Sequence, residues 1–82
     1  MSTLVKTKDR AFYADGYIHI CMDGGLELSF PVAKNPRLAK GTPEQLNNIT
    51  LTPFGIHWPD LDEDLSKAGL VEGDFGQFQR VL

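Results

Sequence analysis

The side chains that could do chemistry gather in one segment, from Phe54 to Ser66. It reads FGIHWPDLDEDLS and holds the only tryptophan, one of the two histidines and four carboxylates within five residues. Imidazole and carboxylate groups bind metal ions and transfer protons, and a dense set of carboxylates also attracts basic partners. The segment could therefore form a metal site, a catalytic site or a charged recognition surface.

A metal site is the first possibility, because three aspartates alternate here as the first ligands of a calcium loop do. They are Asp60, Asp62 and Asp64. A calcium loop also needs glycine at its sixth position and glutamate at its twelfth, where this chain has Leu65 and Val71. A transition-metal site would have one nitrogen ligand, His57, since His19 lies far away in the sequence. We therefore predict no metal site and no cofactor.

A catalytic triad is the second possibility, since the residue types are present. His57, Ser66 and an aspartate could be combined, but Ser66 lacks the glycine-flanked elbow and the oxyanion-hole pattern of serine hydrolases. Cys21 lies inside a strand-like stretch, where a small buried thiol is the ordinary interpretation. We predict that the chain is not an enzyme and has no catalytic residues.

The overall composition is that of one small folded domain. A chain of 82 residues with 41% hydrophobic and 10% aromatic residues can form a single core. The formal charge is −3, whereas a dedicated nucleic-acid binder normally carries a basic excess. There is no signal-peptide pattern and no apolar run near the roughly 18 residues of a membrane span, and the single cysteine fits a reducing compartment. We expect a soluble, cytoplasmic protein.

Alternating apolar residues and two turn dipeptides predict an antiparallel meander in the first part of the chain. The strands are expected near residues 11–14, 17–22 and 26–30. Asp15-Gly16 and Asp23-Gly24 supply the positive φ that tight hairpins require. The extra Gly25 predicts a bulge or a longer loop at the second turn.

Short helices are expected to cover the apolar face of this sheet. Pro36 suits the first turn of a short helix. Thr42 predicts the N-cap of a second helix, with Gln45 completing a capping box and Asn47-Asn48 as its end.

The second part of the chain predicts a bent fourth strand between Ile49 and Trp58. Phe54, Ile56 and Trp58 are expected to close the core. Two arrangements are open after Pro59, and each gives a short helix.

In the first arrangement Asp60 caps a helix, with Glu63 as its N3 partner. In the second, which we favour, the acidic run stays extended and Ser66 caps a helix over residues 67–71. The tail, residues 74–82, is apolar and is expected to dock on its own domain or on a partner.

These elements predict an α+β fold with a three- to four-stranded antiparallel meander sheet and two or three short helices on one face. Residues 1–73 form a single domain, and residues 74–82 form the tail.

Three motifs in this order resemble a known family. They are Pro36-Arg37-Leu38, Thr42-Pro43-Glu44-Gln45 and the block from Gly55 to Ser66, GIHWPDLDEDLS. The chain is similar, over about residues 10–73, to the bacterial domain of unknown function 2442 family. The resemblance implies a small α+β domain without an assigned activity, often encoded beside another small protein in candidate toxin–antitoxin pairs.

The acidic run is the predicted recognition surface. Trp58 either anchors the core or stands partly exposed beside the acidic run as an interface anchor. The predicted partner-binding residues are Trp58, Asp60, Asp62, Glu63 and Asp64. We predict a non-catalytic, antitoxin-like domain that binds a small basic protein, and exchange of Asp62, Glu63 and Asp64 for amides should weaken capture without damaging the fold.

An alternative is a nucleic-acid-binding or transcription-regulatory module that uses a local basic patch. Lys34, Arg37 and Lys40 form a loose stripe, to which Lys6, Lys8 and Arg10 could add. A salt-sensitive mobility shift on promoter DNA would identify such a module. A homodimer is a further expectation, since a small sheet with an open edge can pair with its copy.

Overall fold

The first sheet is the predicted meander. A computed structural model describes residues 9–22 and 24–77. Strands β1 (Arg10–Ala14), β2 (Tyr17–Cys21) and β3 (Glu27–Pro31) pair antiparallel in the order β1-β2-β3. Asp15 and Gly16 both have positive φ, 54° and 85°, as a tight two-residue hairpin requires. The connection from β2 to β3 is longer, as the extra glycine predicted.

The second half of the chain forms a three-stranded sheet of its own, in the order β4-β5-β6. The strands are β4 (Thr50–Leu51), β5 (Gly55–Trp58) and β6 (Glu63–Ser66). The α+β class and the antiparallel meander are confirmed, and the predicted fourth strand is in fact the β4–β5 hairpin. The chain turns there because the Thr52 hydroxyl accepts hydrogen bonds from the amides of Phe54 and Gly55.

Two 3-10 turns and two short α-helices complete the fold. They are η1 (Val32–Lys34), η2 (Leu38–Lys40), α1 (Pro43–Asn47) and α2 (Lys67–Val71). Thr42 and Gln45 form the predicted capping box on α1. The favoured arrangement after Pro59 is confirmed at its end, where Ser66 ends β6 and its hydroxyl caps α2 by accepting from the Gly69 amide at 2.9 Å. The acidic run itself is extended only from Glu63 onward, because residues 59–62 form a turn in which Asp62 has a φ of 53°.

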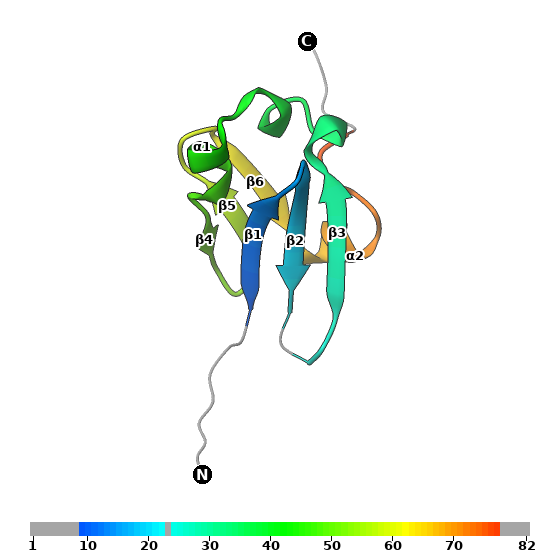
Figure 1. Ribbon diagram of the computed structural model, residues 1–82. Helices are drawn as coiled ribbons and strands as arrows, with labels where there is room; N and C mark the ends of the chain where they lie inside the picture. Colours follow the sequence, from blue (N-terminus) through cyan, green and yellow to red (C-terminus); the bar gives the residue numbers. More distant parts are fainter. Residues whose placement is uncertain (1–8, 23, 78–82) are drawn as a thin grey trace.

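The core lies between the two sheets, which form separate layers with α1 at one end (Figure 1). The buried apolar residues come from both sheets, from η2 and from the two α-helices: Ile18, Ile20, Phe30, Leu38, Leu46, Ile56, Trp58, Leu65 and Leu70. The apolar face of the first sheet is therefore covered by the second sheet as well as by the short helices. In the described part of the chain no helix is long and apolar enough to cross a membrane.

The prediction that Phe54 closes the core is wrong, because its side chain is 82% exposed. Phe54 lies in the turn between β4 and β5, so the alternation that buries Ile56 and Trp58 begins only at Gly55. Gly55 itself is buried, and a Cβ at this position would lie 2.3 Å from the Leu65 carbonyl oxygen.

Both ends of the described chain are tied to the domain. The Lys67 ammonium pairs with the carboxylate of Asp9, which is only 5% exposed. The Phe75 ring stacks on Phe30, with 4.8 Å between ring centroids. The tail therefore docks on its own domain up to Gln77, and Phe78, Val81 and Leu82 lie outside the described residues.

Candidate partner-binding site

The acidic run lies on a hairpin whose two strands alternate between core and solvent. In β6, Glu63 and Leu65 point inward, while Asp64 and Ser66 point outward. The β5–β6 connection, residues 59–62, brings Asp60 and Asp62 to the surface. The period of two in an extended strand buries Glu63 and exposes Asp64, and the turn exposes Asp60 and Asp62.

Trp58 belongs to the core. Its side chain is 0% exposed, and the indole Nε1 donates a hydrogen bond to the Leu46 carbonyl oxygen at 3.1 Å. This geometry satisfies the polar end of a ring that is otherwise surrounded by apolar groups. The core interpretation of Trp58 is confirmed, and a direct contact between its ring and a partner does not fit this burial.

Glu63 is also part of the interior, at 6% exposed. Its Oε2 accepts a hydrogen bond from Asn35 Nδ2 at 2.7 Å, and its Oε1 lies 3.6 Å from Arg37 Nε. A buried carboxylate needs such partners, because removing it from water without them is costly. Glu63 thus holds the hairpin to the η1–η2 segment, and its predicted place among the partner-binding residues is corrected.

Asn35 is the residue that organises this region, and the sequence analysis did not single it out. Its side chain is 0% exposed, and its Oδ1 accepts from the amides of Arg37 and Leu38, both at 3.0 Å. Its Nδ2 donates to Glu63 and to the Phe75 carbonyl at 2.9 Å. The one available signal was an asparagine before a proline, a common turn-forming pair.

The three exposed carboxylates each lie near a polar group of another residue. Asn48 Nδ2 donates to Asp60 Oδ2 at 2.9 Å, and Asp62 Oδ2 lies 4.0 Å from Arg37 Nη1. The Asp62 side chain is 93% exposed, and its φ of 53° places it in the left-handed region. Asp62 therefore stands at the tip of the connection and points into solvent.

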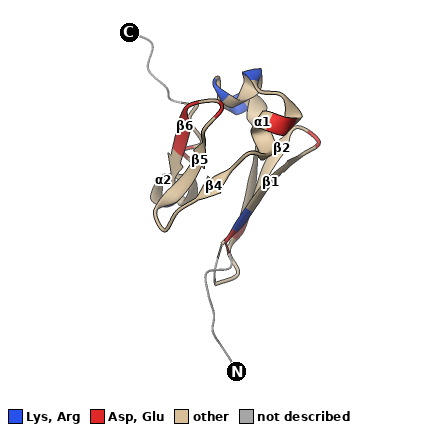
Figure 2. Cartoon of the chain, turned by 90° about the vertical axis from the view of Figure 1, so that its left-hand side faces the viewer, with Lys and Arg blue, Asp and Glu red and all other residues tan. Residues whose placement is uncertain are grey.

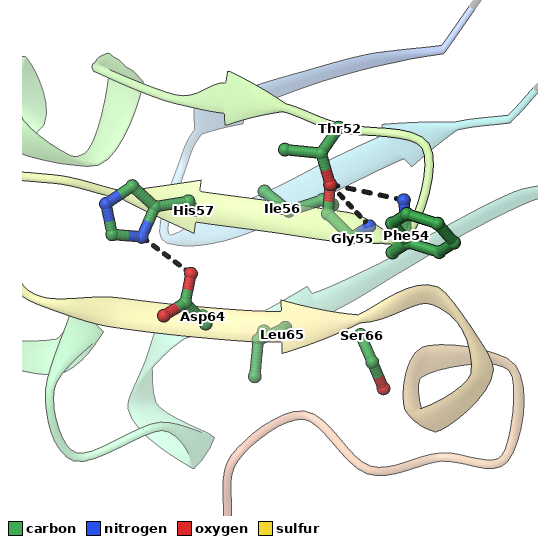
Figure 3. Close-up of a pocket in the computed structure, with 8 residues that line it drawn as sticks. All are labelled: Thr52, Phe54, Gly55, Ile56, His57, Asp64, Leu65 and Ser66. Carbon is green, nitrogen blue, oxygen red and sulfur yellow. Dashed lines mark hydrogen bonds and ion pairs between the residues drawn. The ribbon is translucent and has the colours of Figure 1, made fainter.

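Asp64 pairs with His57 across the hairpin, in a shallow hollow of about 220 Å³ (Figure 3). His57 Nδ1 and Asp64 Oδ1 are 2.6 Å apart, and the Asp64 side chain is 78% exposed. The exposed Phe54 ring stands at the other end of this hollow. His57 is thus a hydrogen-bonded surface residue, on the face of β5 that points away from the core.

The predicted basic patch and the predicted acidic patch meet in one groove. Arg37 and Lys40 face Asp60 and Asp62 across an open groove of about 540 Å³, and Leu61 provides apolar surface between them. Figure 2 shows the basic segment and the acidic connection at the same end of the molecule. Repulsion among the carboxylates is thereby offset by cations from another element.

Lys34 is the third residue of the predicted basic patch. It is exposed on η1 and does not line the groove. Within the described residues, no three His, Cys, Asp or Glu side chains come together in a way that could hold a metal ion.

Comparisons with known proteins agree with the family resemblance. A family model described as "Protein of unknown function (DUF2442)" matches residues 9–76. The comparison with curated proteins found no match. A crystal structure of a protein of unknown function from Rhodospirillum rubrum ATCC 11170 is similar, with a TM-score of 0.72 and 27% identity over 88% of this chain and 93% of that chain.

Proposed function

This chain belongs to the DUF2442 family, and we propose that it is a non-catalytic protein-binding domain, the antitoxin-like partner of a small basic protein. The observation that carries the proposal is the exposure of Asp60, Asp62 and Asp64 on the β5–β6 hairpin, whose strands are anchored in the core. Three carboxylates directed into solvent from one hairpin form a negative surface of the kind that attracts and orients a basic partner.

The buried members of the same segment make this surface rigid. Glu63 joins Asn35 and Arg37, and Trp58 bonds to Leu46, so both strands that flank the connection are fixed. A connection between two anchored strands loses less backbone entropy on binding than a free segment does. Of the five predicted partner-binding residues, Trp58 and Glu63 therefore support the surface. The three exposed aspartates are the ones that would contact a partner.

The groove beside the connection adds a second element to the surface. Because Arg37 and Lys40 lie opposite Asp60 and Asp62, a partner must present charges of both signs in the matching order. Such an arrangement favours one orientation of the partner, and Leu61 offers it an apolar contact. The nucleic-acid alternative gains no support from this geometry, since Arg37 is paired with Asp62 and Glu63.

The test is co-purification with the product of the neighbouring gene, using a chain in which the three exposed aspartates are changed. The variant combines Asp60→Asn, Asp62→Asn and Asp64→Asn, and the matched control is Glu72→Gln, an exposed carboxylate next to α2. We expect the triple variant to bind at least about tenfold more weakly at low salt, with a difference that shrinks as salt is added. The control should bind as the unchanged chain does.

Stability decides between a contacting and a supporting role. The triple variant should unfold within about 1 kcal/mol of the unchanged chain, because exposed pairs contribute little. Unchanged capture together with a lowered melting temperature would show that these carboxylates serve the fold and would refute the proposal.

A further inference from the structure

The outer face of the first sheet carries aromatic side chains where a solvated sheet normally carries polar ones. Phe12 and Tyr17 are 42% and 45% exposed. The Phe12 ring stacks on His19 with 5.0 Å between centroids, and Tyr17 lies 6.2 Å from the same ring. In Figure 1 this sheet faces the viewer, and no described element crosses in front of it. An exposed apolar face of this kind is typical of an interaction surface.

The strand register arranges the outward side chains in three rows across β1, β2 and β3. The rows are Arg10–Cys21–Glu27, Phe12–His19–Ser29 and Ala14–Tyr17–Pro31. In the first row, β1 contributes a cation and β3 an anion. In the second, β1 contributes a large ring and β3 a small hydroxyl. In these two rows the β1 edge of the face is therefore complementary to the β3 edge, in charge in the first and in size in the second.

We propose that this face binds a second copy of the chain, as a symmetric dimer whose twofold axis runs along β2. When two sheets pack face to face about such an axis, β1 of one copy lies over β3 of the other. Arg10 then meets Glu27 of the partner subunit, and Phe12 lies over Ser29 of the partner subunit. Cys21, on the central strand, lies over Cys21 of the partner subunit.

The charges of the face favour a second copy over other occupants. Arg10 and Glu27 lie two strands apart in the same row, with Cys21 between them. Among the described residues, neither of them has an ion-pair partner. In the dimer, Arg10 of each copy pairs with Glu27 of the other copy, so that two ion pairs form. A nucleic acid would need a face with a net positive charge, and this face is neutral.

The size of the face sets the expected strength of the dimer. Three strands of five residues cover about 17 by 14 Å, which is well below the roughly 800 Å² per partner of a standard interface. We therefore expect an equilibrium between monomer and dimer at concentrations between about 10 μM and 1 mM. The surface is separate from the acidic hairpin, so this dimer and the proposed partner-binding function can fail independently.

The first test measures mass against concentration for the full chain, by light scattering or sedimentation equilibrium, using charge reversal. Arg10→Glu and Glu27→Arg should each weaken self-association at least about tenfold, because like charges then face each other. An equimolar mixture of the two variants should recover the dimer, since both ion pairs form again between unlike chains. Lys34→Glu, on exposed η1, is the control and should leave self-association unchanged.

The second test uses the single cysteine. A bismaleimide that spans about 8 Å should link Cys21 to Cys21 of the partner subunit, because sheets packed about 10 Å apart bring two facing thiols within its reach. Cys21→Ser should abolish the link but not the dimer. A chain that stays monomeric at all concentrations, a dimer that the mixture fails to restore, or a dimer without the link would overturn the proposal.

Discussion

At the scale of single residues, the acidic segment depends on a side chain that carries no charge. Asn35 uses its amide oxygen to turn the backbone at Arg37 and Leu38, and its amide nitrogen to hold Glu63 and the tail. Each of these groups is buried or partly buried, so each would lose a hydrogen bond if the amide were absent. The position of the exposed aspartates is thus set from within the domain.

Asn35→Ala should therefore lower the free energy of unfolding by about 2–4 kcal/mol, through unsatisfied buried polar groups. Asn48→Ala, which removes an amide from the exposed contact with Asp60, should cost less than about 1 kcal/mol. Denaturant unfolding of both variants measures the difference. Equal losses would mean that Asn35 is not the organising residue.

Trp58→Phe tests whether the tryptophan supports the site or contacts the partner. The smaller ring leaves a gap in the core and removes the donor to the Leu46 carbonyl, so stability should fall by about 1–3 kcal/mol. Partner binding, measured by calorimetry below the melting temperature, should change less than about threefold. A loss of affinity as large as that of the triple aspartate variant would contradict the assigned supporting role.

At the scale of elements, the β5–β6 hairpin separates the residues that support the acidic surface from those that we propose contact a partner. β6 buries alternate residues against the core, and the connection before it exposes its carboxylates. The close approach of the two strands at Gly55 is part of this arrangement, since no side chain fits between Gly55 and the Leu65 carbonyl.

Gly55→Ala should disrupt this hairpin. A Cβ 2.3 Å from a backbone oxygen can be accommodated only if the strands move apart, and we expect a loss of at least about 2 kcal/mol. Gly24→Ala, where nothing lies within 4 Å of the added atom, should cost less, through its φ of 96° alone. Thermal unfolding of the two variants provides the comparison, and an equal or larger effect at Gly24 would be inconsistent with this packing.

Local chemistry explains which elements could be predicted from the sequence. The Asp15-Gly16 turn, the Thr42–Gln45 capping box and the Ser66 cap each depend on groups within a few residues, and all were predicted correctly. The separate second sheet and the exposure of Phe54 depend on the Thr52 turn, where alternation is interrupted. The burial of Glu63 depends on Asn35, which is 28 residues away, so no local pattern indicates it.

At the scale of the whole molecule, the two layers differ in the charge of their surfaces. The layer of the second sheet carries the acidic connection, with Arg37 and Lys40 beside it, while the outer face of the first sheet is neutral and aromatic. The formal charge of −3 therefore understates how negative the hairpin is. A basic partner and a second copy of the chain would bind on different sides.

This separation predicts that the two associations respond differently to salt. Binding of a basic partner should weaken markedly between low and physiological salt, because the carboxylates of the acidic hairpin that would contact it are exposed to solvent. Self-association through the aromatic face should change less, since apolar contact contributes most of its area. Calorimetry and sedimentation over the same salt series measure the two, and equal salt dependence would argue against two distinct surfaces.

The most direct test of the central claim is a nuclear magnetic resonance titration of the labelled chain with the product of the neighbouring gene. We predict that the amide signals of Asp60, Leu61, Asp62 and Asp64 shift on binding, together with those of Arg37 and Lys40 across the groove. The chemical shifts of residues on the outer face of the first sheet should not change, provided that the concentration of the chain is held fixed. Shifts confined to that face, or no shifts in the acidic connection while the partner binds, would contradict the account.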